Sequence, residues 1–570
     1  MAVRVRKYQN LIEALEAAPD ERPFITHSVD EDERETVTFA EFRQRARAHA
    51  ALLNRHGVRT GDRVIVIMPQ TIAAMSVFVG AMMLGAVPAF LAYPNFKVEP
   101  SKYRSGLAGV SANLQAKVVV IDAEFPEELL GHITLGGATK VLRATSTYET
   151  DESCDWSVGE LAFIQHSAGT TGLQKGVALT HVAVLRQIEH LEHTLKIDGA
   201  ADCIYSWLPL YHDMGLIACF VLPMVLHMPV VMQSPLDWVM QPETMLQVIT
   251  ESQCTLGWMP NFAFQFVPRR TPQKRWAQYD LSSLRALINC SEPVRSSSMH
   301  EFEQAFGAIG LKQGVLQSSY AMAENVFAVT QSVIGSSQGP LQVWADGRKF
   351  RSEHVIYPVS PNATGAVTFT SSGKVLPNNE VRIVNEGDEP LPAGRVGEIH
   401  VKSDSLFTGY FNRPDLTATV LVNGWYRTGD LGFLLQGELF VVGRKKDLLI
   451  VGGENLYPQD IEEIVAAHAA IHDGRVVAMG LYNPDLGTED IVIVAEVERE
   501  ALLDDAEDVE REIRKMVVSG TGVAPRRIFL KPPKWIVKST AGKAARSATR
   551  EKLLREHAEL NGEGITEKNP

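Results

Sequence analysis

A glycine- and threonine-rich run in the first half of the chain has the composition of a phosphate-binding loop. Residues 167–176 read Ser-Ala-Gly-Thr-Thr-Gly-Leu-Gln-Lys-Gly and follow the apolar run Leu161–Ile164. Glycines let the backbone approach a phosphate closely, and consecutive N–H groups form an anion-binding nest. Thr170 and Thr171 add hydroxyl donors, and Lys175 adds a positive charge. The spacing is not that of the Walker loop, and on its own such a run is equally consistent with a surface turn.

Five further residues carry groups that could bind the rest of a nucleotide. Tyr320 could stack on a base, and Glu324 could hold Mg²⁺, which prefers one or two carboxylates plus phosphate oxygens. Asp430, between two glycines, could accept hydrogen bonds from ribose, and Arg444 could pair with phosphate in a bidentate fork. Lys543, on a glycine loop, could reach a developing negative charge. Each has an ordinary alternative as core packing, a turn former, a linker or a surface lysine.

The elements that position these residues follow from the hydrophobic pattern. The first half alternates β-branched runs, such as Lys117–Ile121, with helical periodicity, which predicts an α/β fold with mainly parallel sheets. Between about Ala366 and Val442, strand-like runs separated by Gly, Pro and Asn predict an antiparallel-rich subdomain. A compact α+β pattern follows Gly443–Lys446. We therefore expect a large domain over residues 1–443 and a small, mobile C-terminal domain over 444–570.

Composition narrows the function classes. The 570 residues carry 55 Lys and Arg against 68 Asp and Glu, a net charge of −13 without a long basic run, which argues against nucleic-acid binding. Five scattered cysteines without a CxxC pair argue against a zinc site or a disulfide framework and fit a reducing cytoplasm. The uncharged stretch Val64–Phe96 is long enough to cross a bilayer. Its Pro and Gly breaks favour a buried strand–helix–strand unit instead, so we expect a cytoplasmic protein without a membrane span.

In this order and over these spacings, the segments resemble the adenylate-forming superfamily. That superfamily includes acyl-CoA synthetases, fatty acyl-AMP ligases, peptide-synthetase adenylation domains and firefly luciferase. The resemblance runs from about Leu52 to Lys543, nearly the whole chain. It is strongest to fatty acyl-AMP ligases, in the segments Leu208–Ile217, Pro260–Phe264, Asp280–Arg285, Ser291–Arg295, Thr428–Phe433 and Asn455–Glu462.

The resemblance implies an ATP site with Mg²⁺. The pyrophosphate end of ATP would be held by Ser167, Gly169, Thr170, Thr171, Gly172 and Lys175. The adenine would be lined by Cys290, Ser291, Glu292 and Pro293, with Tyr320, Ala321 and Met322 against it. Asp430 would hold the ribose with Arg444 nearby, and Glu324 would bind the metal. Lys446 would be the hinge of the C-terminal domain.

The implied catalytic set is Lys543, His212, Thr170 and Glu324. Lys543 would bridge the carboxylate and the α-phosphate, and His212 would lie beside the acyl carboxylate. Carboxylate attack on phosphorus brings two anions together, so positioning and positive charge are what catalysis requires.

The implied reaction converts a hydrophobic carboxylic acid and ATP to acyl-AMP and pyrophosphate. The favoured acceptor of the acyl group is the phosphopantetheine thiol of a holo acyl carrier protein, with coenzyme A as the alternative. A luciferase-like oxygenase and an inactive nucleotide-binding relative are remote alternatives. No Asp is evident where amino-acid-activating relatives bind an ammonium group, and aromatics are dense in the region of the acyl pocket. They are Trp207, Tyr211, Phe220, Trp258, Phe262, Phe264 and Phe266, which could equally be core.

Some features depart from the family pattern. Ala168 replaces a usual hydroxyl or glycine, and Ser539–Lys543 matches the usual Thr-x-Ser-Gly-Lys only loosely. Val451–Asn455 is more similar to acyl-CoA synthetases. The interval from Tyr320 to Gly373 spans 53 positions and includes a polar segment, 338–362. Fatty acyl-AMP ligases carry an insertion here that is thought to restrain the C-terminal domain, although such an interval could also be a long surface loop.

Overall fold

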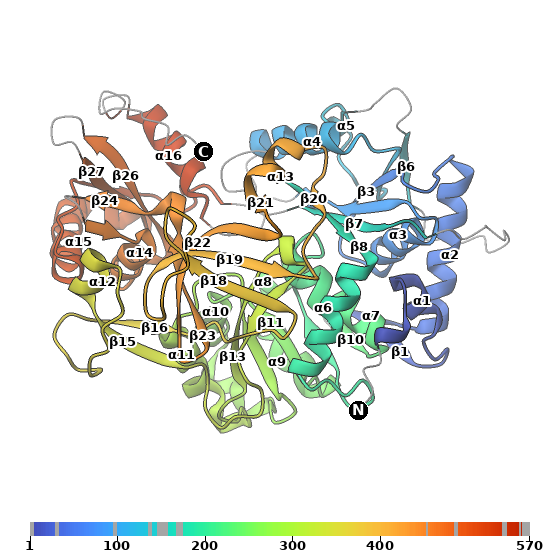
Figure 1. Ribbon diagram of the computed structural model, residues 1–570, viewed down its shortest axis with the longest axis horizontal. Coiled ribbons are helices and arrows are strands. Elements are labelled where there is room, and N and C mark those ends of the chain that lie inside the picture. Colours follow the sequence, from blue (N-terminus) through green and yellow to red (C-terminus); the bar gives the residue numbers. More distant parts are fainter. Residues whose placement is uncertain are drawn as a thin grey trace.

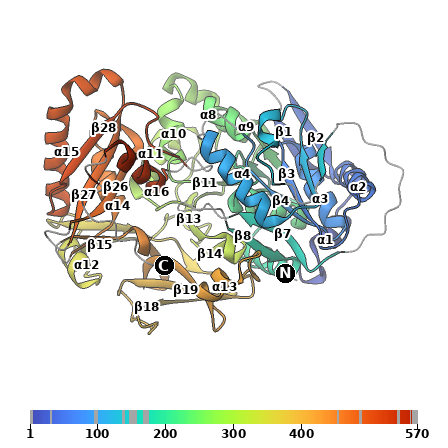
Figure 2. The same cartoon turned by 90° about the horizontal axis from the view of Figure 1, so that it is seen from above.

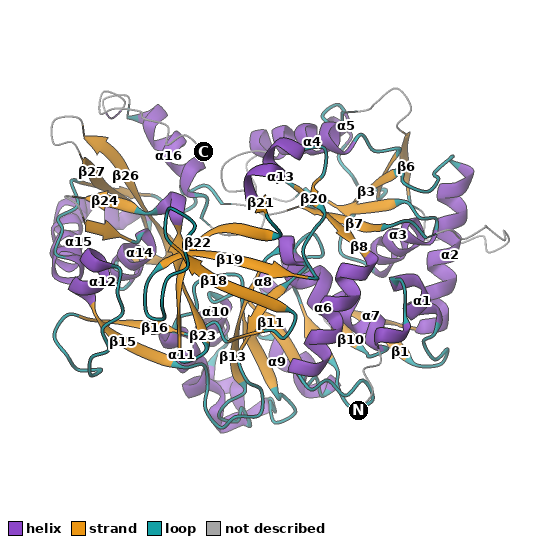
Figure 3. Ribbon diagram, in the orientation of Figure 1, coloured by secondary structure: helices purple, strands orange, loops and turns teal. Residues whose placement is uncertain are grey.

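The computed structural model describes residues 5–28, 33–94, 100–134, 140–144, 158–166, 175–451, 454–483, 488–538, 544–557 and 560. Figure 1 shows the C-terminal elements at one end of the long axis and the first strands and helices at the other. The view from above in Figure 2 shows the same separation, with α15 (Ala506–Thr521) and α2 (Phe39–Arg55) at opposite ends. Figure 3 shows strands through the middle of the molecule and at its C-terminal end, with helices around and between them.

The largest sheet joins a parallel half to an antiparallel half. The parallel half has the order β13-β12-β11-β9-β10-β1, with antiparallel β2 at its edge. The antiparallel half has the order β18-β19-β22-β23-β17-β14, and β14 pairs with β13. The parallel half comprises β1 (Pro23–Ser28), β2 (Arg34–Thr38), β9 (Ile204–Ser206), β10 (Val230–Met232), β11 (Leu256–Met259), β12 (Ala286–Asn289) and β13 (Leu316–Ala321). The antiparallel half comprises β14 (Ala328–Gln331), β17 (Lys374–Val375), β18 (Asn379–Val384), β19 (Gly397–Ser403), β21 (Leu421–Val422), β22 (Trp425–Leu435) and β23 (Glu438–Arg444).

Smaller sheets and helices complete the part before Arg444. A parallel sheet has the order β4 (Val87–Phe90), β3 (Arg63–Ile67), β5 (Val118–Ile121) and β6 (Lys140–Arg143). A second small sheet has the order β20 (Gly409–Tyr410), β8 (Gly176–Thr180) and β7 (Leu161–His166), and β15 (Gln342–Asp346) pairs with β16 (Ala366–Thr370). The helices are α1 (Leu11–Glu16), α2, α3 (Ile72–Met83), α4 (Pro100–Leu114), α5 (Glu127–Leu130), α6 (His181–Thr194), α7 (Leu222–Leu226), α8 (Pro235–Met240), α9 (Thr244–Ser252), α10 (Ala263–Arg270), α11 (Ser296–Phe306), α12 (Gly347–Glu353) and α13 (Pro414–Val420).

The uncharged stretch of the sequence forms the predicted strand–helix–strand unit. It comprises β3, α3 and β4, and α3 is buried on nearly all sides. Full burial explains why this helix needs no polar face. Among the described residues, no helix combines the length and the apolar character that crossing a bilayer requires.

The part after Lys446 has its own core. It comprises β24 (Leu449–Val451), β25 (Glu454–Leu456), α14 (Pro458–Ala466), β26 (Ile471–Asn483), β27 (Thr488–Val497), α15, β28 (Arg527–Lys531) and α16 (Arg546–Glu556). Two hydrophobic clusters consist only of residues from this part, including Ile461, Ile493 and Ile513. Tyr457 is the exception, because it is buried in a cluster with Phe350 and Phe433. The expected α/β fold with parallel and antiparallel-rich sheets is confirmed, and the boundary at 443/444 stays a prediction.

Candidate active site

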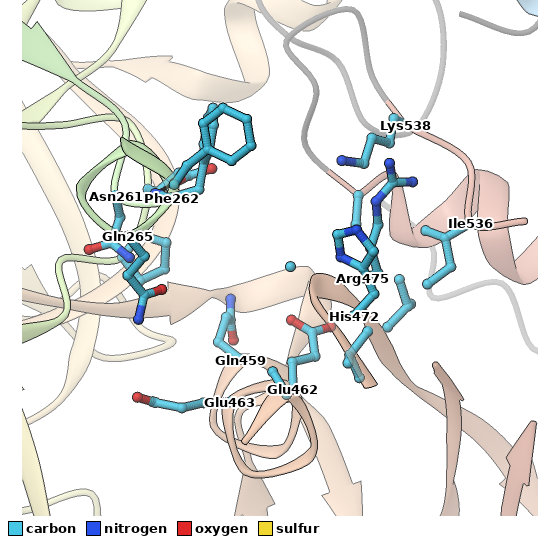
Figure 4. A pocket seen from close by; sticks show the side chains of 18 of the residues that line it. Asn261, Phe262, Gln265, Gln459, Glu462, Glu463, His472, Arg475, Ile536 and Lys538 are labelled. Atoms are coloured by element: carbon cyan, nitrogen blue, oxygen red, sulfur yellow. Dashed lines mark hydrogen bonds between the residues drawn. The ribbon is translucent and has the colours of Figure 1, made fainter. Parts of the chain in front are cut away.

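A large cleft lies between the part of the chain before Arg444 and the C-terminal part. Its volume is about 2480 Å³, and residues of both parts line it. Figure 4 shows Asn261 and Phe262 on one wall, with Arg475 and Lys538 on the opposite wall. The residues predicted to bind the nucleotide that line this cleft are Ser291, Glu292, Pro293, Tyr320, Ala321, Asp430 and Arg444.

Asp430 interacts with two other residues of the cleft wall, Arg444 and Tyr320. It is the cross-strand partner of Arg444 in the β22–β23 pair, and Arg444 Nε lies 3.6 Å from Asp430 Oδ1. The Tyr320 hydroxyl donates a hydrogen bond of 2.5 Å to Asp430 Oδ2. Burial raises the pKa of Asp430, and the Arg444 guanidinium opposes that rise. Such a carboxylate on a cleft wall is suited to accept hydrogen bonds from a diol.

The turn after β12 is held in a fixed conformation beside Tyr320. β12 and β13 are parallel neighbours, so their carboxyl ends bring this turn and Tyr320 to the same sheet edge, where ligands commonly bind in α/β folds. Ser291 has a positive φ of 70°, and the Glu292 carboxylate accepts a hydrogen bond of 2.9 Å from the Phe262 backbone N–H. Residues that adopt this backbone region without being glycine are uncommon and cluster at functional sites.

Glu324 is linked through Tyr410 to Lys175, near the end of the glycine- and threonine-rich run. Its side chain is buried, and Oε1 accepts a hydrogen bond of 2.8 Å from the Tyr410 hydroxyl. Burial and the Glu324 carboxylate raise the pKa of Tyr410, so its hydroxyl keeps the proton that it donates. Lys175 Nζ lies 4.7 Å from the centre of the Tyr410 ring. Sequence reasoning missed Tyr410, because its place depends on the pairing of β20 with β8, more than 200 residues away.

A lone buried carboxylate fits Mg²⁺ better than it fits a transition metal. Within the described ranges, no three His, Cys, Asp or Glu side chains gather as a metal-binding cluster. Mg²⁺ does not require such a cluster, because substrate phosphates and water supply most of its ligands. Glu324 is therefore compatible with the predicted metal role.

His212 occupies a tightly packed turn. Its Nδ1 lies 3.7 Å from Asp213 Oδ1, and a π-helix, Met214–Val221, follows. Gly215 is required here, because a Cβ at this position would lie 2.3 Å from the Pro209 carbonyl oxygen. Short π-helical segments are frequent at functional sites. His212, Met322, Glu324, Lys175 and Lys446 are not among the residues that line the cleft.

The hinge candidate Lys446 and the residues on either side of Lys543 lie near the nucleotide-binding candidates. Lys446 is part of a short 3₁₀ turn, 445–447, after β23, where burial and the neighbouring Arg444 lower its pKa. Lys538 and Ala544, on either side of 539–543, line the same cleft as Tyr320 and Asp430. The predicted residues Lys543, Ser167, Gly169, Thr170, Thr171 and Gly172 lie outside the described part of the chain.

The aromatic residues expected near the acyl group divide into two sets. Phe220, Trp258 and Phe264 are buried in the main hydrophobic core. Phe262 and Phe266 line the cleft, together with Met240 of α8. Beneath Phe262 and Phe266, the rings of Trp207 and Trp238 stack at 3.6 Å.

The predicted insertion folds against the start of the C-terminal part. Residues 338–362 contain β15 and α12. The ring of Phe350 in α12 stacks on Tyr457 at 5.3 Å with an interplanar angle of 20°. Asn455 Nδ2 lies 2.6 Å from His354 Nε2.

Comparison with known proteins identifies the family. The family model described as AMP-binding enzyme matches residues 12–411. The chain belongs to the AMP-binding enzyme family. A putative fatty-acid–CoA ligase of Mycobacterium leprae is 30% identical over 569 residues, which cover 94% of this chain and 96% of the relative. A 4-hydroxyphenylalkanoate adenylyltransferase of Mycobacterium marinum is 29% identical over 564 residues, which cover 93% of this chain and 88% of the relative.

Solved structures agree with this family. A structure from work on the fatty acyl-adenylate ligases of E. coli and L. pneumophila has a TM-score of 0.88 at 27% identity and covers 97% of this chain and 98% of that one. A fatty acyl-adenylate ligase of L. pneumophila in complex with acyl adenylate and pyrophosphate has a TM-score of 0.72 at 26% identity, with 96% and 97% covered. The expected resemblance of this AMP-binding enzyme to fatty acyl-AMP ligases is confirmed, and so is its class as an acid–AMP ligase.

Proposed function

We propose that this enzyme uses ATP to convert a hydrophobic carboxylic acid into an acyl adenylate, with release of pyrophosphate. One observation carries the proposal. Tyr320, Asp430 and Arg444 share a single cleft with Lys538 and Ala544, which flank the loop of Lys543. A nucleotide bound against the first three residues would therefore share this cleft with the residues on either side of Lys543.

The nucleotide contacts would divide between the two halves of the main sheet. The turn 290–293 and the ring of Tyr320, at the carboxyl ends of β12 and β13, would hold the adenine. Asp430, with Tyr320 and Arg444 already on its carboxylate, would accept the ribose hydroxyls. Lys175 and the preceding loop would hold the phosphates.

Glu324 would hold Mg²⁺, which supplies neutralisation of phosphate charge when bound. Tyr410 donates to one oxygen of Glu324 and thereby fixes the orientation of the carboxylate. Because Lys175 lies over the same Tyr410 ring, Tyr410 contacts both the Glu324 carboxylate and Lys175.

In the reaction, an oxygen of the carboxylate would attack the α-phosphorus of ATP. An acyl–phosphate bond forms as the bond from this phosphorus to the bridging oxygen of pyrophosphate breaks. Lys543 would place positive charge between the two anions, and His212 would lie beside the carboxylate. Positioning and charge stabilisation of this kind are the main means of catalysis in phosphoryl transfer.

The acid would be apolar. Met240, Phe262 and Phe266 are apolar residues that line the cleft, and Met240 is 73% exposed. Two relatives are named for an aromatic and a long-chain acid: the M. marinum 4-hydroxyphenylalkanoate adenylyltransferase and a long-chain-fatty-acid–AMP ligase of Mycolicibacterium smegmatis. We therefore infer a lipophilic acid without an amine.

The acceptor would be the phosphopantetheine thiol of a holo carrier protein. The stacking of Phe350 on Tyr457 supports this choice, because it ties the insertion to the part of the chain that would have to rotate for thiolation. Coenzyme A is the second candidate, favoured by the small residues Gly452 and Gly453 and by relatives named as fatty-acid–CoA ligases. The free thiols of Cys203, Cys219 and Cys254 support a cytoplasmic location.

A thiol comparison tests the acceptor. The enzyme, ATP, Mg²⁺ and an accepted acid are mixed with coenzyme A or with a panel of holo carriers at equal thiol concentration. Faster thioester formation on a carrier supports the proposal, whereas rapid formation of acyl-CoA by the intact protein contradicts it.

A further inference from the structure

Arg295 joins the nucleotide-binding side of the cleft to the first helix after the hinge. It lies two residues beyond Pro293 and lines the cleft. Its Nη2 donates a hydrogen bond of 3.0 Å to the backbone carbonyl of Gln459, and its Nη1 forms an ion pair with Glu463. Gln459 and Glu463 lie one turn apart on α14, so one guanidinium engages two points of the same helix. A planar fork of this kind fixes geometry as well as charge.

The base of Arg295 is rigidly held. Its backbone N–H donates a hydrogen bond of 3.0 Å to Asn261 Oδ1. The same oxygen accepts a hydrogen bond of 2.8 Å from Asn289 Nδ2 at the end of β12. Asn261 Nδ2 donates 3.0 Å to Ser298 Oγ in α11. Asn261 is buried, with 7% of its surface exposed. These hydrogen bonds fix the backbone of Arg295 to the carboxyl end of β12. The nucleotide would bind at this same end of the sheet.

The helix at the other end belongs to the C-terminal part. Ile461 and Val465 of α14 are buried in the same cluster as Ile493 and Ile513. Glu462 accepts a hydrogen bond of 2.7 Å from Arg546. The other terminal nitrogen of Arg546 donates a hydrogen bond of 2.7 Å to Asp447, next to the hinge candidate Lys446. The position of α14 is thus linked to that of Arg546, three residues after Lys543.

We propose that Arg295 is a positioning residue for adenylation, which holds the C-terminal part in the orientation in which Lys538 and Ala544, on either side of Lys543, line the same cleft as Tyr320 and Asp430. This inference rests on the proposed function. Any rotation about Lys446 must break the contacts of Arg295 with Gln459 and Glu463, because their two ends lie on opposite sides of the hinge. The link therefore stabilises one of the two orientations selectively, and an interaction of unequal strength in two states is what shifts their populations.

The test compares Arg295→Ala and Glu463→Gln with the parent enzyme in both half-reactions. Adenylation, measured by ATP–pyrophosphate exchange, should fall about 2- to 5-fold, the upper range for exposed ion pairs. Thioester formation from synthetic acyl-AMP should be unchanged or faster. The charge exchange Arg295→Glu with Glu463→Arg should recover much of the lost adenylation. Arg269→Ala is the matched control, because Arg269 lines the same cleft but pairs with Glu301 at 2.7 Å on its own side of the hinge.

Equal losses in both half-reactions, no loss in either, or no recovery on charge exchange would overturn the inference. A direct readout separates it from the proposed function. Dyes attached through Lys402→Cys and Lys515→Cys, one on each side of the hinge, report the orientation by energy transfer. Arg295→Ala should broaden the distance distribution, whereas Arg269→Ala should not, and equal distributions in all three proteins contradict the inference. Absence of pyrophosphate exchange in the parent enzyme with every acid would refute the proposed function and leave this readout intact.

Discussion

The Tyr320 hydroxyl donates a 2.5 Å hydrogen bond to Asp430, a residue 110 positions further along the chain. This bond joins the last strand of the parallel half of the sheet, β13, to β22 of the antiparallel half. The base-stacking and ribose-binding candidates are thereby held as one unit, with Arg444 on the other side of the carboxylate.

Tyr320→Phe should weaken ATP binding by about 10-fold while changing the maximal rate less. Loss of the hydroxyl leaves the partly buried Asp430 carboxylate without one of its donors, which costs about 1–2 kcal/mol. The measurement is ATP–pyrophosphate exchange at varied ATP. Tyr457→Phe is the matched control, because the Tyr457 hydroxyl is buried without a hydrogen-bond partner among the described residues. Equal ATP affinity in Tyr320→Phe and the parent would contradict the role given to this bond.

Lys543→Ala should slow adenylation by about 10²–10³, the usual loss for one positioned electrostatic group. Thioester formation from pre-formed acyl-AMP should be much less affected, because rotation about Lys446 would carry Lys543 away after the first step. Lys534→Ala is a suitable control, since Lys534 is exposed and lines the same cleft. Equal losses in both half-reactions of Lys543→Ala would argue against domain rotation.

Phe350→Ala should increase the use of coenzyme A up to about 10-fold, because an aromatic pair contributes about 0.5–1.5 kcal/mol to holding Tyr457 and the C-terminal part in place. Acyl-CoA formation is measured with pyrophosphate exchange as the reference. Tyr357→Ala serves as the control, because Tyr357 is in the same insertion and is 41% exposed. The restraint would be refuted by a deletion of residues 338–362 that leaves coenzyme A use unchanged.

His49 should make folding stability sensitive to acid. It is buried between α2 and α3, where its Nδ1 lies 3.0 Å from Ser76 Oγ, and burial lowers its pKa to about 4. An unfolded histidine has a pKa of about 6.5, so the unfolded chain binds a proton first as pH falls. The folded state is therefore favoured above pH 6.5, and about 3 kcal/mol is lost as pH falls through 4. Thermal unfolding midpoints of His49→Gln should vary less between pH 7 and 5 than those of the parent; equal slopes would contradict this.

Local pattern was sufficient to predict the fold class and the strand–helix–strand unit of β3, α3 and β4. It also marked Asp430 and Arg444 as candidates, because each stands in a recognisable motif, and their roles stay predictions. Pattern could not predict that the two residues are cross-strand partners, since the register depends on a bulge between Leu431 and Gly432.

Other features depend on contacts between distant segments. Tyr410 reaches Glu324 because β20 pairs with β8, and Phe350 reaches Tyr457 because the insertion folds back on the C-terminal part. Neither pairing leaves a local signal in the sequence. The residue type also does not show which aromatic side chains are in the core and which line the cleft. Phe264 and Phe266 are both phenylalanines of α10, but Phe264 is buried and Phe266 lines the cleft.

Adenylation itself is tested most directly by ATP–pyrophosphate exchange with a panel of carboxylic acids and Mg²⁺, without any thiol. We expect exchange with at least one lipophilic or aromatic acid, recovery of acyl-AMP as the product, and strong loss of exchange in Lys543→Ala. If a folded protein that binds ATP supports no exchange with any lipophilic or aromatic acid, the account of this enzyme as an acyl adenylate-forming ligase is wrong.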